Sequence, residues 1–101
     1  MIENDNYKFL LEIGFTLNEA KVYLTLLQNR YLNGYEISKL SKVSRSLVYN
    51  VIDRLVAKGF ILKSEGQINY YCALPYDKVI EKIRNDNTNK LNVAREKLKN
   101  Y

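Results

Sequence analysis

The sequence predicts a mainly α-helical domain of the α+β class, with a two-stranded β-hairpin and a long C-terminal helix. Apolar residues recur at the spacing of one helical face in several segments before residue 59. Residues 60–73 break this period and are rich in β-branched and aromatic types, which favour strands. Residues 76–101 contain neither glycine nor proline, so one helix can run through them. With 101 residues, 47% of them hydrophobic, the chain has enough apolar material for one small domain and one additional element.

Two helices are predicted in the first third of the chain. The first covers residues 5–13 and ends at Gly14. Thr16 and Glu19 have the spacing of a capping box, in which the threonine hydroxyl accepts from the backbone of Glu19 and the glutamate reaches back. The helix that follows, residues 17–28, is apolar around more than half of its circumference. It is therefore predicted to be the central helix of the domain.

A helix-turn-helix is predicted next. Asn33 can cap a short helix over residues 35–40, and residues 41–43 make a tight connection to a longer helix over residues 44–58. The longer helix ends before Gly59, which suits a left-handed C-cap. The apolar positions predicted to lie in the core are Leu24, Leu27, Ile37, Leu40, Val48, Ile52 and Leu55.

A β-hairpin follows the longer helix. Strands are predicted at residues 60–65 and 68–73, on either side of a tight turn at Gly66 and Gln67. A hairpin placed directly after a recognition helix forms the wing of a winged helix-turn-helix. Residues 1–75 are therefore predicted to be a DNA-binding domain of this fold.

The C-terminal segment, residues 76–101, is predicted to be a dimerisation helix. Apolar residues recur in it at alternating spacings of three and four, the pattern of a short coiled coil. A second copy of the chain can cover this stripe; the alternative is that the helix folds back on its own domain. The residues predicted at the dimer interface are Ile80, Ile83, Asn87, Leu91, Ala94, Leu98 and Tyr101.

Positive charge is concentrated on the predicted helix-turn-helix. The whole chain carries a net charge of +5. Residues 30–63 hold seven basic and two acidic side chains, a net charge of +5, whereas residues 1–29 carry −2 and residues 64–101 carry +2. This distribution favours a polyanion as the partner of the helix-turn-helix.

The residue content argues against an enzyme, a metal site and a bound cofactor. The chain has no histidine, the commonest general base and metal ligand. Its single cysteine, Cys72, can form neither an internal disulfide nor a cysteine metal cluster, and one reduced thiol fits a cytoplasmic protein. No apolar run approaches the roughly 20 residues that a membrane span needs. We therefore predict a cytoplasmic protein that binds neither a metal nor a membrane.

The candidate DNA contacts lie on and beside the helix over residues 44–58. Asparagine suits adenine's donor and acceptor, serine is unselective, and tyrosine can meet a thymine methyl group or a phosphate. On this basis the candidates for base contact are Ser46, Tyr49 and Asn50, on the helix that Ser44 opens in the major groove. The candidates for phosphate contact are Lys39, Lys42, Arg45, Arg54 and, on the wing, Lys63. Arg45 can alternatively read a guanine, although its position near the apolar face favours the phosphate. Packing at the helix edge is an equally simple role for Tyr49.

Three segments resemble the TrmB-like transcriptional regulators. The segment LLEIGFTLNEAKVYLTLL resembles their opening helices, SRSLVYNVIDRLVAKGFI resembles their recognition helix, and YCALP resembles the end of their wing. The matching residues are Leu11, Gly14, Phe15, Thr16, Glu19, Ala20, Val22, Tyr23, Leu24, Ser44, Arg45, Ser46, Val48, Tyr49, Ile52, Leu55, Lys58, Gly59, Tyr71, Ala73 and Pro75. The resemblance covers residues 7–76 and implies a winged-helix regulator that dimerises through the helix after the wing.

Many members of that family continue into a sugar-binding effector domain. The present sequence ends before such a domain, so it is expected to be a short member or the DNA-binding fragment of a longer regulator, and no small-molecule effector is predicted. The predicted function is sequence-specific binding of double-stranded DNA by a homodimeric repressor, with helix 44–58 in the major groove and wing 61–73 near the backbone or the minor groove. Two alternatives are a winged-helix protein-interaction module and an RNA-binding domain. The basic face over residues 44–54 favours DNA.

Overall fold

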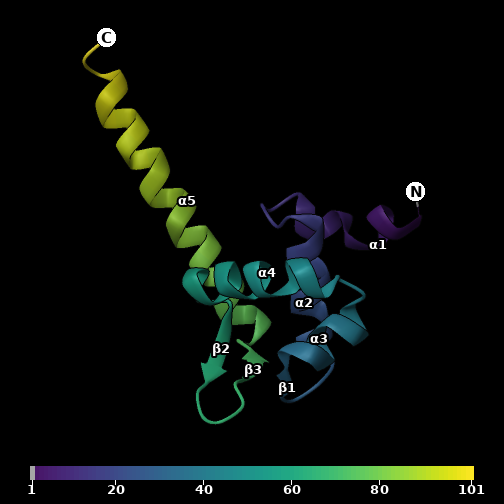
Figure 1. The fold of residues 1–101 in the computed structure, drawn as a ribbon. Helices are drawn as coiled ribbons and strands as arrows, with labels where there is room; N and C mark the ends of the chain where they lie inside the picture. The colour runs from purple at the N-terminus through teal and green to yellow at the C-terminus, as the bar shows by residue number, and fades with distance from the viewer. Residues whose placement is uncertain (1) are drawn as a thin grey trace.

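The computed structural model describes residues 2–101, with side chains from Asn6 onward. Four helices and three short strands form one body, and a fifth helix projects from it (Figure 1). In chain order the elements are α1 (Ile2–Leu11), α2 (Leu17–Leu27), β1 (Leu32–Asn33), α3 (Gly34–Ser41), α4 (Arg45–Lys58), β2 (Ile61–Ser64), β3 (Tyr70–Ala73) and α5 (Tyr76–Leu98). The predicted mainly helical winged helix-turn-helix, with a long C-terminal helix, is confirmed.

The predicted capping box at Thr16 is present, and the predicted Asn33 cap forms a second one with Glu36. At the start of α2, the Thr16 hydroxyl accepts from the Glu19 backbone at 3.1 Å, and the Thr16 backbone donates to Glu19 Oε1 at 2.9 Å. Asn33 and Glu36 make the same reciprocal pair at the start of α3, at 2.8 and 2.9 Å. Each box satisfies two backbone donors that the first turn of a helix leaves without an internal partner.

Several predicted boundaries are wrong by a few residues. The first helix covers Ile2–Leu11 rather than residues 5–13, because residues 12–14 turn and Gly14 adopts a φ of 109°. α2 ends at Leu27 and α5 at Leu98, earlier than predicted. Ser44 has the extended backbone of an N-cap but makes no side-chain cap bond; its hydroxyl lies 3.1 Å from that of Ser46.

The sheet has three strands rather than the predicted two, in the order β1-β3-β2. β1 pairs antiparallel with β3, with Leu32 opposite Tyr71. β2 and β3 are shorter than predicted, and residues 65–69 join them in place of a two-residue turn. The additional strand, β1, runs directly into α3 and pairs with β3, so it connects the wing to the helix-turn-helix.

The core lies around α2, which packs against α1, α3, α4 and β3. Four of the predicted core residues are fully buried: Ile37, Val48, Ile52 and Leu55. Leu24 is partly buried against the same cluster. α5 contributes Val79 to the core, and Ile83 packs against it.

Leu40 and Leu27 are not core residues, contrary to prediction, since they are 53% and 40% exposed. At Leu40 the reason is the turn after α3, where two serines occupy the inner side of the helix. Ser38 donates to the Val43 carbonyl at 2.7 Å, and the Val43 backbone donates to the Ser41 hydroxyl at 3.2 Å. Val43 itself is buried there. Leu27 closes the last turn of α2, where the helix ends at the surface.

Candidate nucleic-acid interface

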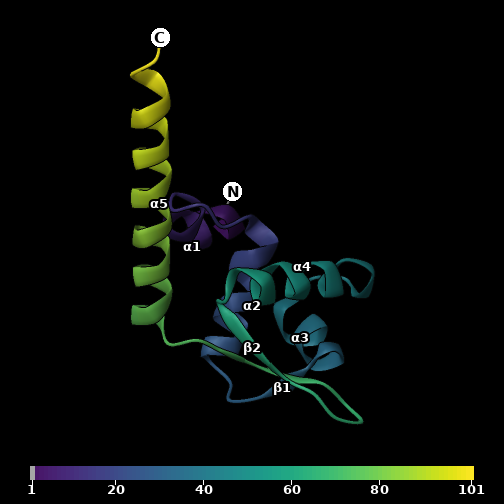
Figure 2. The same cartoon turned by 90° about the vertical axis from the view of Figure 1, so that its left-hand side faces the viewer.

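α4 presents an exposed polar face opposite its buried stripe. Val48, Val51, Ile52 and Leu55 are buried, while Ser46, Asn50 and Asp53 are exposed. The N-terminal half of α4 and the β2–β3 hairpin both extend away from α5 (Figure 2). The candidate residues for base contact therefore share one side of the molecule with the wing.

Tyr49 lies on the flank of α4 that faces α3 and the wing. Its ring packs directly over Gly34, where a Cβ atom would collide with the ring, yet the residue is 44% exposed. Tyr49 thus packs at the helix edge and remains accessible. It also lines a recess of about 260 Å³, together with Asn33, Gly34, Tyr35, Ile68, Asn69 and Tyr71.

Arg45 and Lys39 both approach the exposed ring of Tyr35. The Arg45 guanidinium carbon is 5.2 Å from the ring centroid, and Lys39 Nζ is 6.0 Å from it. The guanidinium lies within the range of a cation–π contact, which restrains a side chain without neutralising its charge. This cation–π contact holds the first residue of α4 next to the first turn of α3.

Glu19 forms a buried ion-pair cluster on the opposite flank of α4. Its side chain is 1% exposed. Oε2 lies 3.1 Å from Arg54 Nε and 3.1 Å from Lys58 Nζ, and Oε1 accepts from Lys58 at 3.2 Å. Burial alone raises the pKa of this carboxyl, but the Thr16 backbone N–H, Lys58 and Arg54 outweigh it and lower the pKa below the ordinary 4.5.

Sequence reasoning assigned Glu19 only its capping role. The cluster could not be found from spacing, since its partners lie 35 and 39 residues away in the chain. Arg54, predicted to contact phosphate, keeps 49% of its side chain exposed while its Nε binds Glu19. Its predicted role stays a prediction, with the added finding that the side chain is anchored.

The remaining candidate lysines are on the surface. Lys42 is exposed at the end of α3, where it adopts a left-handed φ of 66°. Lys63, on β2, lies 3.7 Å from the exposed carboxylate of Glu65. The carboxylate of Glu65 at the wing tip therefore offsets part of the positive charge that Lys63 gives to the wing.

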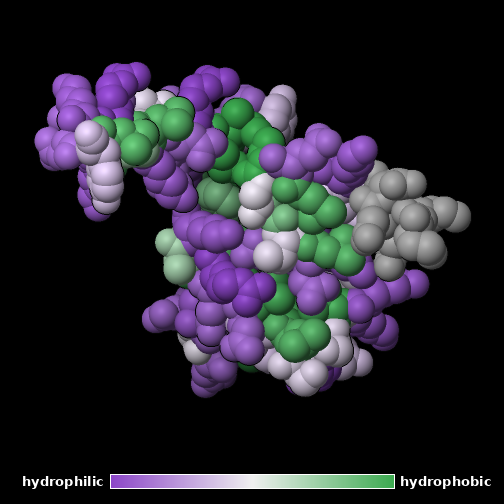
Figure 3. Space-filling view, turned by 90° about the horizontal axis from the view of Figure 1, so that it is seen from above, coloured by the Kyte–Doolittle hydropathy of each residue, from purple (hydrophilic) through white to green (hydrophobic). Residues whose placement is uncertain are grey.

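The predicted interface stripe on α5 is largely uncovered. Ile80, Leu91, Leu98 and Tyr101 are exposed to at least 41%, whereas Ile83 is partly buried against the body. Figure 3 shows hydrophobic patches on the projecting part of α5 and on the body beside it. Both regions belong to the same upper face of the molecule.

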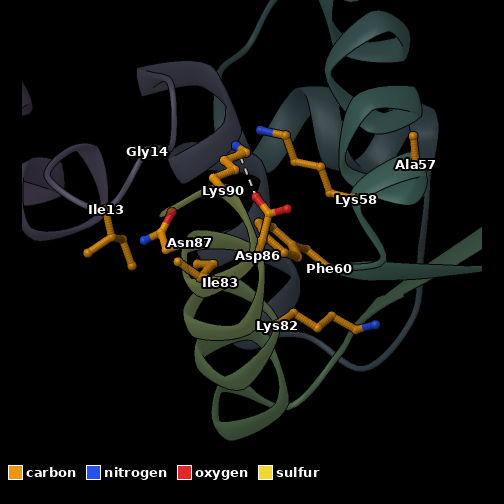
Figure 4. Close-up of a pocket in the computed structure, with 10 residues that line it drawn as sticks. All are labelled: Ile13, Gly14, Ala57, Lys58, Phe60, Lys82, Ile83, Asp86, Asn87 and Lys90. Carbon is orange, nitrogen blue, oxygen red and sulfur yellow. Dashed lines mark ion pairs between the residues drawn. The ribbon is translucent and has the colours of Figure 1, made fainter. Parts of the chain in front are cut away.

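A second recess, of about 470 Å³, lies where α5 leaves the body (Figure 4). Ile83 and Asn87 of the α5 stripe line it, with Ile13 before α2 and Phe60 after α4. On its rim Lys90 pairs with Asp86 at 3.0 Å. The stripe thus passes this recess at Ile83 and Asn87 and continues along the projecting part of the helix.

No metal site or membrane span is found in the part of the chain that the structure describes. The side chains that the structure describes, those of residues 6–101, include no group of three His, Cys, Asp or Glu placed to hold a metal ion. None of the described helices is both long and apolar enough to cross a bilayer. Cys72 is half-buried and free.

Comparison with known proteins identifies relatives of this chain. The family profile described as "Sugar-specific transcriptional regulator TrmB" matches residues 10–77. The sugar-sensing transcriptional regulator TrmBL1 of Pyrococcus furiosus is 31% identical over 86 residues, which cover 85% of this chain and 25% of the regulator. The uncharacterized protein YrhO of Bacillus subtilis is 39% identical over 75 residues, covering 74% of this chain and 27% of YrhO. The chain thus spans about a quarter of the length of these relatives.

Solved structures share the fold. TrmBL2, described as an archaeal chromatin protein with a novel mode of DNA binding, superposes with a TM-score of 0.85 at 28% identity, over 96% of this chain and 38% of TrmBL2. A MarR-family regulator superposes with a TM-score of 0.66 at 17% identity, over 94% of this chain and 66% of that protein. At 17% identity the second match supports the winged-helix fold alone.

Proposed function

The chain belongs to the TrmB family of transcriptional regulators, and from that premise we propose that it binds double-stranded DNA as a homodimer and represses transcription. The observation that carries the proposal is the exposed polar face of α4, which lies beside the wing on the most basic part of the chain. A regulator of this kind acts by occupying its site, and the cytoplasm is the compartment we expect for it. Catalysis has no part in the proposed function.

In the proposed complex the N-terminal half of α4 enters the major groove. Ser46 and Asn50 contact base edges from the exposed face, and Tyr49 contacts a base or a phosphate from the flank. The wing, residues 61–73, lies near the backbone or the minor groove. Charged side chains around this face neutralise phosphates and fix the register of the protein on the duplex. They are Lys39, Lys42, Arg45, Arg54 and Lys63.

The proposed dimer contact is the α5 stripe, from Ile80 to Tyr101. Its exposed leucines and small Ala94 suit the close approach of a second α5. Two α4 helices set about 34–36 Å apart by such a dimer would require a near-palindromic site with half-sites one helical turn apart. In this proposal residues 1–75 are the DNA-binding unit and residues 76–101 are the dimerisation segment.

The proposal is tested by selecting duplexes from a random DNA pool and measuring the affinity of the best one as a function of salt. Each phosphate contact releases condensed counterions, so log K should fall linearly with log salt, with a slope of about −0.9 per contact. A single preferred sequence with a steep slope is the expected result. No binding at low salt, or binding that does not respond to salt, would contradict it and favour a protein-interaction module.

The assignment of the reading face is tested with two variants of that face and its border. Asn50→Ala should relax the selected sequence, since a bidentate base contact contributes about 1–3 kcal/mol of discrimination. Lys42→Ala should weaken all sequences alike and leave the selected motif unchanged. If Lys42→Ala changed the selected motif and Asn50→Ala left it unchanged, the residues that read the bases would not be those assigned on α4.

A further inference from the structure

The Glu19 cluster connects the start of α2 to the second half of α4. Its carboxylate is buried and accepts hydrogen bonds from the Thr16 backbone, from Arg54 and from Lys58. Capping α2 needs only the bond to Thr16. The two bonds to α4 are additional and hold two cations of the recognition helix at defined positions.

Arg54 is anchored through its Nε, which leaves its two Nη groups free to bind another partner. A guanidinium has five N–H donors, and only Nε–H is engaged by Glu19. Among the described residues the two Nη groups have no hydrogen-bond partner, and 49% of the side chain is exposed. The terminal edge of a guanidinium matches two phosphate oxygens in a bidentate contact.

We propose that Glu19 is a positioning residue for DNA binding, which holds Arg54 by Nε so that its two Nη groups are pre-oriented to grip one backbone phosphate. This inference rests on the proposed function, because it assumes that α4 lies in the groove of a duplex. A free arginine loses rotamer freedom when it binds a phosphate, whereas Arg54 has given up part of that freedom on folding. Lys58 completes the cluster and keeps the buried carboxylate satisfied on both oxygens.

If net charge alone governed DNA affinity, replacing Glu19 would strengthen binding rather than weaken it. Replacing it by glutamine removes a negative charge and raises the net charge of the chain from +5 to +6. A polyanion should bind such a variant more tightly if charge were the only factor. If Glu19 positions Arg54, the same variant should bind more weakly, so the two explanations differ in the sign of the change.

The experiment measures the affinity of the intact chain for a labelled duplex selected from a random pool by the wild-type protein. Glu19→Gln and Arg54→Ala should each weaken binding about tenfold, the range of one charge-assisted hydrogen bond. Each should also reduce the slope of log K against log salt by about one phosphate contact. The double variant should bind as weakly as Arg54→Ala and no weaker, since both changes remove the same contact.

Two further variants keep the test independent of folding and of net charge. Arg54→Lys retains the charge and leaves the α2 cap and the Lys58 bonds intact, but a lysine cannot bind Glu19 and present a fork to a phosphate at the same time. It should weaken binding about as much as Glu19→Gln. Glu81→Gln is the matched control, since it removes one negative charge from an exposed position on α5, away from the proposed DNA-binding face, and should leave affinity equal or higher.

The results separate this inference from the proposed function. A wild-type chain that selects no duplex contradicts the proposed function itself. A wild-type chain that binds, with folded Glu19→Gln or Arg54→Lys binding as tightly or more tightly, overturns the positioning role alone. Additive losses in the double variant would also overturn it, because they would mean that Glu19 and Arg54 act through separate contacts.

Discussion

The double substitution Leu91→Asp/Leu98→Asp should convert the protein from a dimer to a monomer. Both leucines lie on the proposed α5 stripe and are 67% and 69% exposed. Beyond Ile83, α5 has no buried or half-buried residue in its own chain. Beyond Ile83 the stripe is therefore not covered by any described residue of its own copy, and a second copy is the partner we propose.

The size of the effect follows from the exposed surface. Full burial of a leucine stabilises by about 1.5–3 kcal/mol, so covering the exposed two-thirds of one contributes about 1–2 kcal/mol. A two-fold dimer buries four of these side chains, which gives about 4–8 kcal/mol. Loss of that contribution raises the dissociation constant by about three to six orders of magnitude. Repulsion among the four introduced carboxylates adds to the loss.

Sedimentation velocity over a range of protein concentrations measures the change. The intact chain should sediment as a dimer and the double variant as a monomer, with helix content unchanged by circular dichroism because both residues are exposed. Val93→Asp is the matched control, since Val93 is 54% exposed on the same helix but lies about 100° away from Ala94. A monomeric wild type, or a double variant that remains a dimer, would refute the reasoning and place any interface elsewhere, first around Phe9.

Three other predictions concern the body of the molecule. Gly34→Ala should push the Tyr49 ring outward and lower DNA affinity, as binding curves would show. The free energy of unfolding should change by less than about 1 kcal/mol, because the ring is half exposed and alanine favours the helix. Melting curves check this, with Gly66→Ala as the unstrained control for stability. Glu19 should make folding sensitive to acid: its pKa is lowered on folding, so its contribution is present above pH 4.5 and lost as pH falls through the lower folded value. The difference in urea stability between wild type and Glu19→Gln should therefore shrink on acidification below pH 4.5, and a constant difference would contradict the pairing. Ile52→Ala should cost about 2–5 kcal/mol in urea unfolding, because Ile52 is fully buried, whereas Leu47→Ala at the surface should cost less than about 1 kcal/mol.

The helices were predictable because their signals are local. Thr16 and Glu19, like Asn33 and Glu36, are three residues apart, and the capping bonds follow from that spacing. The buried stripe of α4 follows from the helical period, which places Val48, Ile52 and Leu55 on one side whatever the rest of the chain does. Gly59 ends the helix as predicted, with a left-handed φ of 77°.

Other features depend on contacts that spacing does not encode. β1 is only two residues long and has no period of its own; it exists because Tyr70 and Tyr71 of β3 pair with it. Leu40 has the spacing of a core residue, but the serines that fold the next turn take the inner side of α3. In both cases a partner elsewhere in the fold decides the structure.

The sequence alone was sufficient for the fold class, the capped helices, the basic helix-turn-helix and the resemblance to TrmB-like regulators, because each of these depends on neighbours within a few turns of chain. The tertiary structure was needed to bring Glu19 against Arg54 and Lys58, and to place the Tyr49 ring over Gly34. Those contacts join residues on different helices, and their distances are set by how α2, α3 and α4 pack around one core. Which cations of α4 are anchored and which are free is therefore a property of the packed molecule, and no local pattern in the chain specifies it.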